Sequence, residues 1–552
     1  MNSQYQNRRR VARAFKMRGL AVQASALDAM LNVLKRESPH TAQETLHMIL
    51  DEIKERMMSS SNTSQLSQLV VTKRLLSDVV ADMSRDGGDF TDEAVQLLDA
   101  FQMPRLAYDS MRKQFTLMTD SSEERSLFAE APHKADMYAQ RYGLIQQRIL
   151  RQDLFRPRLV TADGRRSDES NATHVLTPVE SLLGQSGLKF LLGMIVQVEE
   201  GRYYLEDTTA QVPMDLTGAE ILTDGFITEN CIVLVEGEMV DGIFQVVRMG
   251  HPIIETRQDA LDAIGLQNTD IFNSMSSLAE QEKMREQEIR HGQDGEFVIL
   301  SDLHLDNPVV FEKLEKMFDA YQDLTPLPIF VFMGNFSSKP LTSAREGPKM
   351  MVSYFEELAN LIGQYPKLAK EGRFIFVPGP NDPGMGSVLP RPPIPAFFTG
   401  AIRSKVPHAN FVSNPCRMRY FSQEIVFCRQ DIVNKLRRNA LISPSNGDID
   451  KEDEQRPVQH ALKSMLDQGH LSPLPQSFSP ICWQYDHALR LYPLPNALIV
   501  GDRVKQCYES YAECDAVNPG SFPSDFSFVV YRPVGECNGD EIKSDVEFSQ
   551  IG

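Results

Sequence analysis

Cysteine is scarce in this chain, and the cysteines present form no recognisable pattern. The 552 residues include seven cysteines, an odd number, and none belongs to a Cys-x-x-Cys pair. This number and spacing argue against a disulfide framework and against a cysteine-based zinc site. The cysteine usage fits a reducing compartment best, either the cytosol or the nucleus.

Long apolar runs are also lacking. No stretch of about eighteen apolar residues occurs, so no transmembrane helix is predicted, and the first residues lack the apolar core of a secretory signal. With 42% hydrophobic and 24% charged residues, the composition is that of an ordinary globular protein. The length exceeds what one hydrophobic core serves and suggests about three or four domains.

Positive charge is in deficit, since 57 lysines and arginines face 75 aspartates and glutamates and give a net charge of −18. Phosphate backbones repel such a chain on average, so a stand-alone nucleic-acid binder is disfavoured and basic partner proteins are favoured. A basic cluster near the start is formed by Arg8, Arg9, Arg10, Arg13, Lys16 and Arg18. It has two interpretations, a mitochondrial transit peptide and the polar face of a first helix with Val11, Ala14 and Phe15 facing inward. The helical pattern that continues beyond it favours the second.

Residues 1–101 are predicted to form a small helical docking domain. Apolar residues repeat at helical spacing in three segments, at 27–34, 46–57 and 66–80. Thr41 and Glu44 form a capping box before the second segment. One more short helix is predicted over residues 91–101. A bundle of this size carries no chemistry of its own.

A linker and a small β-domain are predicted to follow. Residues 102–180 are expected to be a connector with one helix, around residues 137–152. Five short strands separated by turn signals are then predicted at 190–198, 203–206, 211–216, 231–239 and 243–249. Strands this short and close together predict an OB-fold barrel over residues 181–275, although a fragment of a β-sandwich would give a similar pattern.

Residues 276–552 are predicted to form a layered α/β domain. Buried strands are expected at 297–300, 328–333, 373–377, 424–427, 497–500 and 526–531. Helical stretches, such as 309–321 and 350–362, lie between several of them. This alternation is typical of an α/β sandwich.

Four of these strands end in short polar motifs. Asp302 and His304 follow the first strand, and the polar residues after three others are Asn335, Asn381 and Asp502. Active sites of α/β folds gather where strands end, so these motifs point to one site.

In their order and strand context, the motifs resemble those of the calcineurin-like metallophosphoesterases, which read Asp-x-His, Gly-Asp-x-x-Asp, Gly-Asn-His-Asp/Glu and a final Gly-His-x-His. The resemblance covers residues 297–531. The chemistry of that family needs two metal ions about 3.5–4 Å apart, with a carboxylate between them to offset their repulsion. Only Asp302 and His304 match the ligands that the resemblance implies. The positions of the bridging aspartate, the asparagine ligand, the general-acid histidine and the last two histidines hold Asn335, Pro380, Asn381, Asp502 and Val504.

The sequence therefore predicts no catalytic residue, no metal and no cofactor. An amide such as Asn335 is neutral and cannot bridge two cations, and two remaining ligands do not hold a catalytic metal. Asp302 and His304 are predicted to be a hydrogen-bonded pair that holds the loop after the strand. His470 or His487 could stand for a remaining histidine, but neither lies in a recognisable motif.

An OB-fold followed by a dismantled phosphoesterase domain resembles the B-subunits of eukaryotic replicative DNA polymerases, over about residues 140–552. Detailed matches are the segments 148–151, 204–207, 468–473 and 518–522. Residues 1–101 are similar to the lid domain of AAA+ ATPases, which one branch of these B-subunits carries. No Walker A motif accompanies it, so the resemblance implies docking and not ATP hydrolysis.

What the resemblance implies is a non-catalytic accessory subunit that works in the nucleus. The OB-fold and phosphoesterase-like domains would bind the C-terminal domain of the catalytic polymerase subunit. The helical domain would reach the GINS part of the replicative helicase, and small histone-fold polymerase subunits would belong to the same complex. DNA contact would be weak or indirect, and no membrane would be involved.

Two alternatives remain beside this interpretation. The first is an active metal-dependent phosphoesterase or nuclease, because archaeal relatives of these subunits keep the full metal site. The second is a single-stranded DNA-binding protein that uses the OB-fold. Against the second, residues 188–250 carry 3 basic and 11 acidic side chains, the wrong sign for such a groove. The adjacent Tyr203 and Tyr204 would also point to opposite faces of a strand.

Overall fold

A computed structural model describes most of the chain from residue 94 onward. The gaps after that point lie at 119–124, 156–173, 266–270, 273–277, 342–345, 443, 445–454 and 539–540, and the positions described before it are 11, 15, 21–22, 27, 30 and 70–71. The chain divides into two compact units, Met1–Val95 and Gln96–Gly552.

Within the first unit, helical and extended positions both occur. Helical positions with buried side chains are Val11, Phe15, Leu27 and Met30. The prediction that Val11 and Phe15 face inward is therefore confirmed, whereas Ala14, the basic cluster and the capping box lie outside the described residues. Strand β1 (Ala21–Val22) pairs in parallel with β2 (Val70–Val71). The helix predicted across residue 70 was wrong there, because adjacent β-branched valines favour extended backbone.

The second unit opens with a strand where a helix was expected. Strand β3 (Val95–Asp99) lies at the edge of a six-stranded sheet beside β17 (Cys416–Tyr420). The Ala100 amide just after it donates to Ser413 Oγ at 2.8 Å. The short helix predicted over 91–101 was wrong because partners more than 300 residues away decide this conformation. A hairpin of β4 (Arg105–Asp109) and β5 (Gln114–Met118) follows in the segment predicted as a linker.

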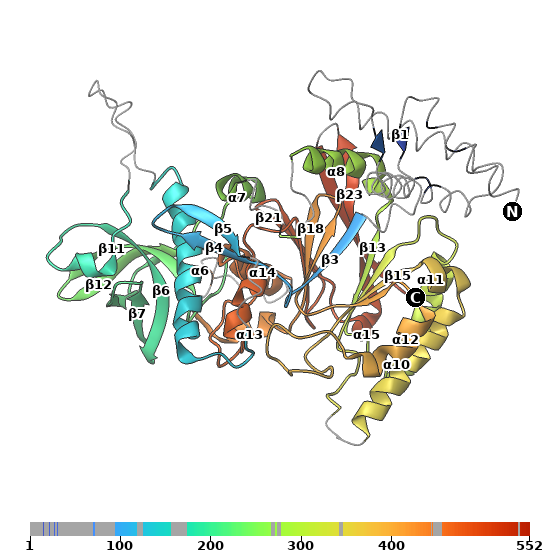
Figure 1. Cartoon of the computed structure of the whole chain (residues 1–552). Coiled ribbons are helices and arrows are strands. Elements are labelled where there is room, and N and C mark those ends of the chain that lie inside the picture. The colour runs from blue at the N-terminus through green and yellow to red at the C-terminus, as the bar shows by residue number, and fades with distance from the viewer. Residues whose placement is uncertain are drawn as a thin grey trace, which may run out of the picture. The chain divides into compact units, whose positions relative to one another are not determined.

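The helix predicted around 137–152 is confirmed and is longer than expected. It is α6 (Ala131–Arg151), with Pro132 in its first turn, where a missing amide proton costs nothing. One face of α6 packs Tyr142, Ile145 and Ile149 against Leu192 and Ile232 of the barrel described next. Figure 1 shows α6 between that barrel and the α/β body, so this part of the predicted linker is a packed element.

The five predicted barrel strands are all present. They are β6 (Lys189–Glu199), β7 (Arg202–Glu206), β8 (Gln211–Asp215), β11 (Ile232–Val240) and β12 (Ile243–Gly250), accompanied by a short β9 (Glu220–Ile221) and preceded by the 3₁₀ turn η1 (Val179–Leu182). The sheet closes on itself because β11 pairs with both β6 and β12. Alternate strand residues fill the barrel with apolar side chains, among them Leu205, Val233 and Phe244.

The α/β body contains two six-stranded sheets. The first has the order β16-β15-β14-β13-β23-β24, with β13 (Phe297–Ser301), β14 (Ile329–Met333), β15 (Arg373–Val377), β16 (Ala409–Phe411), β23 (Ser527–Asn538) and β24 (Glu541–Gln550). The second has the order β21-β22-β20-β18-β17-β3, with β18 (Gln423–Arg429), β20 (Ala497–Gly501), β21 (Cys507–Tyr511) and β22 (Cys514–Asn518). The six strands predicted for this domain are all confirmed, within one or two residues at their starts.

Helices pack on the sheets, and two separate apolar cores lie between them. The first core joins the first sheet to α9 (Pro308–Tyr321), α10 (Gly347–Gly363), α11 (Pro366–Glu371) and α12 (Ala396–Lys405). The second joins β18 and β20 to α13 (Val433–Arg438) and α14 (Arg456–Asp467). Shorter or peripheral elements are α7 (Arg257–Ile264), α8 (Leu278–His291), η3 (Gly292–Asp294), η4 (Trp483–Leu489) and α15 (Phe522–Asp525). In the part of the chain that the structure describes, no helix combines the length and apolarity needed to cross a membrane.

Direct hydrogen bonds fasten the barrel to the α/β body. The side chain of Gln468 both accepts from the Ile232 amide and donates to the Ile232 carbonyl, at 2.8 Å each, and lies 2.8 Å from His251 Nδ1. A strand pair, β10 (Ile227–Thr228) with β19 (Ala440–Ile442), adds a second connection. Because Gln468 is buried, these bonds form away from water, where they are strongest.

Candidate functional site

The polar motifs that follow β13, β14 and β15 meet at one edge of the first sheet. Asp302 Oδ1 accepts from the amide nitrogen of Asn335 at 3.2 Å and from its Nδ2 at 3.0 Å. Asn335 Oδ1 in turn accepts from the Asn381 amide at 2.7 Å. The three strands are parallel neighbours, so their carboxyl ends come together as expected.

An arginine that sequence reasoning missed stands at the centre of this group. Arg429, at the end of β18, is completely buried, and its Nη2 donates to Asp302 Oδ1 at 2.6 Å. Its Nη1 donates to Asp431 Oδ1 at 2.8 Å and to the Gly501 carbonyl at 3.1 Å. The guanidinium thus links the ends of β13, β18 and β20. The only sequence signal was a basic residue two positions after the predicted strand at 424–427.

Glycine at position 501 leaves room for this arginine. A Cβ there would lie 3.0 Å from Arg429 Cδ and 2.6 Å from Ser301 Oγ. The second figure is shorter than real Cβ contacts, so a larger residue would displace one of these side chains. The packing of the Arg429 and Ser301 side chains against the end of β20 therefore depends on this glycine.

Asp302 is ionised in this environment. Burial alone would raise the pKa of its carboxyl, but Arg429 and the Asn335 amide lower it, and the net result is a pKa below the ordinary value. Ser521 Oγ donates to the second carboxylate oxygen at 2.9 Å, and Arg503 Nε lies 3.7 Å from it. For Arg429, the attraction of two aspartates outweighs burial and raises the pKa of the guanidinium. The two charges hold each other in the ionised state.

Asp302 and His304 are hydrogen-bonded through the backbone, since the His304 amide donates to the Asp302 carbonyl at 2.7 Å, but their side chains are not bonded to each other. His304 Nε2 lies 3.9 Å from Asp302 Oδ1, beyond hydrogen-bond distance, and has no hydrogen-bond partner among the described residues. Burial lowers the pKa of the imidazole. Asp302 instead uses Oδ1 for Arg429 and Asn335, which approach more closely.

Two further aspartates at strand ends bind backbone amides. Asp382, next to Asn381, accepts from the Phe336 and Gly379 amides at 2.7 Å each, and burial raises its pKa to about 6. Asp502 Oδ2 accepts from the Ile432 and Val433 amides at 2.7 and 2.9 Å, at the start of α13. Burial raises the pKa of Asp502 as well. Both side chains therefore hold loops in place.

The two histidines considered as possible ligands lie in another polar cluster. His470 Nε2 is 3.2 Å from Asp486 Oδ1, and His487 Nε2 is 3.0 Å from the Met103 carbonyl oxygen. Burial lowers the pKa of His470 to about 4 and of His487 to about 3, so both are neutral at pH 7. Across the described residues, no group of three or more His, Cys, Asp or Glu side chains is arranged to hold a metal ion.

Two protein families match the two parts of this architecture. Residues 131–253 match the OB-fold domain described as DNA polymerase epsilon subunit 2-like, and residues 297–509 match the family of the B-subunits of DNA polymerases alpha and epsilon. The first match covers α6 with the barrel, and the second covers the strand ends around Asp302. The OB-fold and the α/β body are thus domains of the class found in the B-subunits of DNA polymerases.

Curated relatives define the branch within this class. The chain is 37% identical to the B-subunit of DNA polymerase epsilon of Arabidopsis thaliana, over 97% of this chain and 98% of that protein. It is 36% identical to DNA polymerase epsilon subunit 2 of Homo sapiens (95% and 96%) and 32% identical to that of Drosophila melanogaster (98% and 98%). The chain belongs to the family of DNA polymerase epsilon B-subunits, and it is a non-catalytic subunit in DNA replication. The predicted B-subunit resemblance and the predicted OB-fold are confirmed.

Proposed function

We propose that the α/β body is a calcineurin-like phosphoesterase domain in which a buried ion pair has replaced the metal site. The pair between Arg429 and Asp302 is the observation that carries this proposal. The order of the strand-end motifs supports the likeness to the phosphoesterases. In this proposal Asp302, His304, Asn335, Asn381 and Asp502 are remnants of metal-binding positions that now hold loops together.

The residues present do not fit a pair of divalent ions. A guanidinium 2.6 Å from Asp302 Oδ1 already neutralises the one carboxylate that would bind a metal there, and it would repel a cation. Asn335 supplies no negative charge between two ions, and its amide groups are engaged with Asp302 and Asn381. We therefore assign this domain a structural role and no reaction step.

Metal-dependent hydrolysis should be absent. Purified chain incubated with Mn²⁺ and bis-p-nitrophenyl phosphate is expected to release p-nitrophenol at the buffer rate, because no bridging ligand or general acid is present. Asn335→Asp, which restores a bridging carboxylate but keeps Arg429, should be equally inactive. Mn²⁺-dependent cleavage that Asp302→Ala abolishes would contradict the proposal, and titration calorimetry with Mn²⁺ alone gives a second readout.

We further propose four domains with distinct roles. Residues 1–101, apart from β3 near their end, would form the helical, AAA+ lid-like docking domain. Residues 102–180 would form the linker with its helix, residues 181–275 the OB-fold and residues 276–552 the inactive phosphoesterase domain. Membership of the family implies a complex with the catalytic subunit of DNA polymerase epsilon. The C-terminal domain of that subunit would bind the last two domains, in the nucleus, and the GINS part of the helicase would bind the first. Small histone-fold polymerase subunits would share the complex.

Affinity isolation from the source cells tests these partners. The full chain is expected to bring down the large catalytic subunit together with GINS. A chain that lacks residues 1–93 should retain the catalytic subunit and lose GINS, because this cut leaves β3 in its sheet beside β17. Loss of the catalytic subunit from the shortened chain would contradict the assignment of roles. Recovery of the full chain without any polymerase subunit would contradict the function itself.

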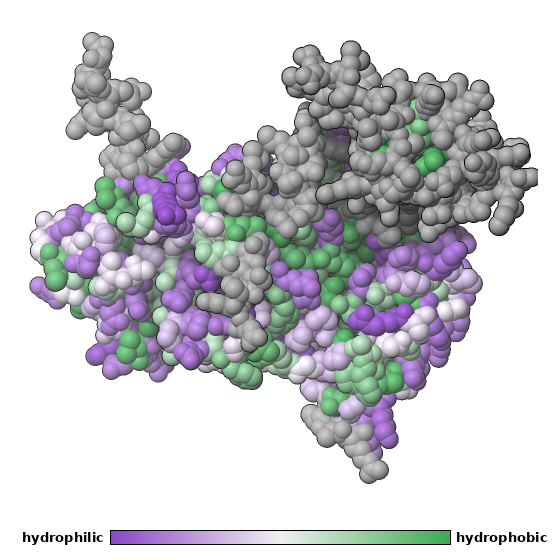
Figure 2. All heavy atoms as spheres, in the orientation of Figure 1, coloured by the Kyte–Doolittle hydropathy of each residue, from purple (hydrophilic) through white to green (hydrophobic). Residues whose placement is uncertain are grey.

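Single-stranded DNA binding is less well supported. Such sites stack bases on exposed aromatic side chains. The large apolar side chains that are well exposed on the described residues 174–253 are all aliphatic, for example Leu183, Val198 and Leu222. Figure 2 shows hydrophilic and hydrophobic groups interspersed over the surface seen there. The barrel is thus better suited to contacts with protein.

A further inference from the structure

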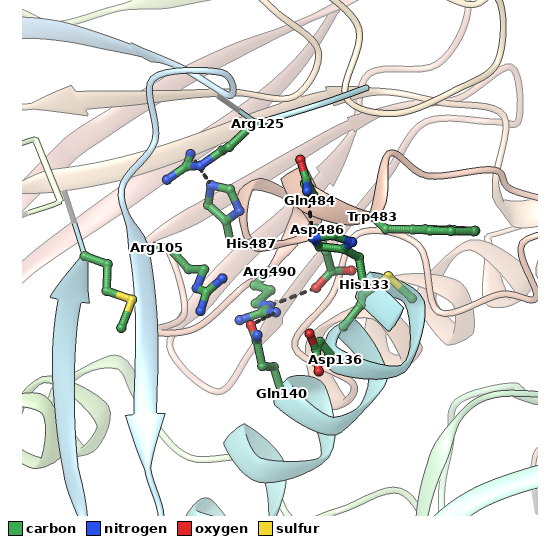
Figure 3. A pocket seen from close by; sticks show the side chains of 12 residues that line it. Arg105, Arg125, His133, Asp136, Gln140, Trp483, Gln484, Asp486, His487 and Arg490 are labelled. Carbon is green, nitrogen blue, oxygen red and sulfur yellow. Dashed lines mark hydrogen bonds and ion pairs between the residues drawn. The ribbon is translucent and has the colours of Figure 1, made fainter. Parts of the chain in front are cut away.

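A polar pocket lies away from the site around Asp302, between α6, the β4–β5 hairpin and η4. Its volume is about 180 Å³. Three arginines line it, Arg105 from β4, Arg125 from the segment before α6 and Arg490 from the residue after η4. Figure 3 shows their guanidiniums gathered on one side of the pocket, with α6 on the other.

The base of the pocket is fixed by one buried carboxylate. Asp486 is 2% exposed and accepts from Arg490 Nε at 2.9 Å and from Arg141 Nε at 2.9 Å. Arg490 Nη2 donates to Gln140 Oε1 at 2.9 Å, which is neutral. A single negative charge therefore serves two guanidiniums, and Arg490 is held rigidly against the pocket.

The other two arginines have no carboxylate partner among the described residues. Arg125 Nη1 lies 3.2 Å from His487 Nε2 and 3.4 Å from the Met103 carbonyl oxygen, both uncharged. No hydrogen bond or ion pair with the described residues holds the Arg105 side chain, and its Nε is buried without a partner. Positive charge in this pocket is thus incompletely neutralised.

Neighbouring titratable groups respond to this excess of positive charge. Burial, then Arg490 and Arg125, lower the pKa of His487, and burial lowers the pKa of Arg490, with Arg141 and Arg105 adding to that effect. The lining also includes His133 and one exposed carboxylate, Asp136. Four guanidiniums, counting Arg141 behind the base, therefore face two carboxylates.

We propose that this pocket binds the phosphoryl group of a phosphorylated serine or threonine on a partner protein. A phosphomonoester carries about −1.5 to −2 charges and three acceptor oxygens, which suits two arginines that no described carboxylate neutralises and a third held in place. Guanidinium groups bind phosphate through paired N–H donors, so their planar shape adds specificity to the charge. Among the described residues, both the donors and the excess of positive charge are present without a ligand.

An isolated phosphoryl group fits better than a nucleic-acid backbone. A backbone needs a continuous basic track, whereas this chain has a net charge of −18 and exposes Asp136 at the pocket. A single anion needs only the pocket itself. Phosphorylation of the partner would then switch its attachment on, independently of the proposed roles of the docking domain and the ion pair.

Binding of a glycine-flanked phosphoserine peptide to the full chain tests the proposal. We expect calorimetric affinity at least about tenfold tighter than for the unphosphorylated peptide, because charge-assisted hydrogen bonds distinguish the two. Arg105→Gln and Arg125→Gln should each weaken binding by about tenfold. Arg112→Gln, which changes an exposed arginine in the turn of the same hairpin, should leave it within about twofold.

A stability readout separates loss of binding from loss of folding. Without anion, Arg105→Gln should melt no lower than the unaltered chain, since Arg105 has no partner to lose and repels Arg490. Inorganic phosphate should raise the melting temperature of the unaltered chain and have less effect on the variant. Equal affinity for the two peptides, or unchanged binding by Arg105→Gln, would overturn the proposal. Displacement of the phosphopeptide by an equimolar oligonucleotide would also overturn it, in favour of a backbone-phosphate site.

One more variant tests whether acidic residues next to Arg125 in the sequence affect phosphopeptide binding. The sequence between Met118 and Arg125 carries Asp120, Glu123 and Glu124. A chain in which these are Asn, Gln and Gln should bind the phosphopeptide at least as tightly as the unaltered chain. Equal or tighter binding would support the pocket as an anion site, and lost binding would count against it.

Discussion

Arg429→Met should lower the free energy of unfolding by about 3–5 kcal/mol, the usual cost of removing one partner from a buried ion pair. The variant leaves Asp302 buried and ionised, with only Asn335 and Ser521 as hydrogen-bond donors. Arg503 is half-exposed and 3.7 Å away, so it would compensate only in part. Chemical denaturation followed by circular dichroism measures the change.

The double variant Arg429→Met with Asp302→Asn is the decisive control. It removes both charges and keeps an oxygen that can accept from Asn335, so much of the lost stability should return. Arg202→Met, at an exposed ion pair with Glu199, should change stability by less than about 1 kcal/mol. A single variant as stable as the original chain would show that the pair does not hold the three strand ends together.

Asp486→Asn should be about equally destabilising, by about 3–5 kcal/mol at pH 7. It leaves Arg141 and Arg490, both largely buried, with a neutral amide in place of their shared carboxylate. The change also weakens the connection between α6 and η4, so we expect α6 to lose protection from hydrogen exchange first. Asp136→Asn, an exposed neighbour on the same pocket, is the matched control and should be nearly neutral.

The loss of stability in Asp486→Asn should depend on pH in a defined way. Burial would raise the pKa of Asp486, but the two arginines and His470 hold it well below its ordinary value. A depressed folded-state pKa contributes stability above the unfolded value near 4, and that stability is lost as the pH falls through the folded value. The difference between Asp486→Asn and the unaltered chain should therefore be constant from pH 7 to about pH 5 and shrink only below about pH 4. If the difference in stability already shrinks near pH 6, a titratable group other than Asp486 is responsible for it.

Local patterns were enough to predict most of the second unit. The barrel strands and the strands of the α/β body were found because their apolar residues alternate or run continuously between turn residues. The order of Asp302, Asn335 and Asn381 at successive strand ends correctly placed these residues together. In each case the sequence pattern lies within a few residues of the strand or strand end that it predicts.

Two of the failures, at β3 and at Arg429, share a physical cause, which is pairing over long separations in sequence. Strand β3 takes its conformation from a sheet whose other strands begin at residue 416. The pairing of Arg429 with Asp302 spans 127 residues, so nothing near either residue revealed it. The expected bond between Asp302 and His304 is made by the backbone, while the distant Arg429 occupies the carboxylate of Asp302.

The bonds of Gln468 to Ile232 have a mechanical consequence. Swivelling of the barrel against the α/β body would break two buried backbone contacts at once, so the two domains should turn together as one piece. The surfaces of the two domains would therefore keep a constant spacing and orientation relative to each other. Flexibility between domains would then have to lie outside this interface.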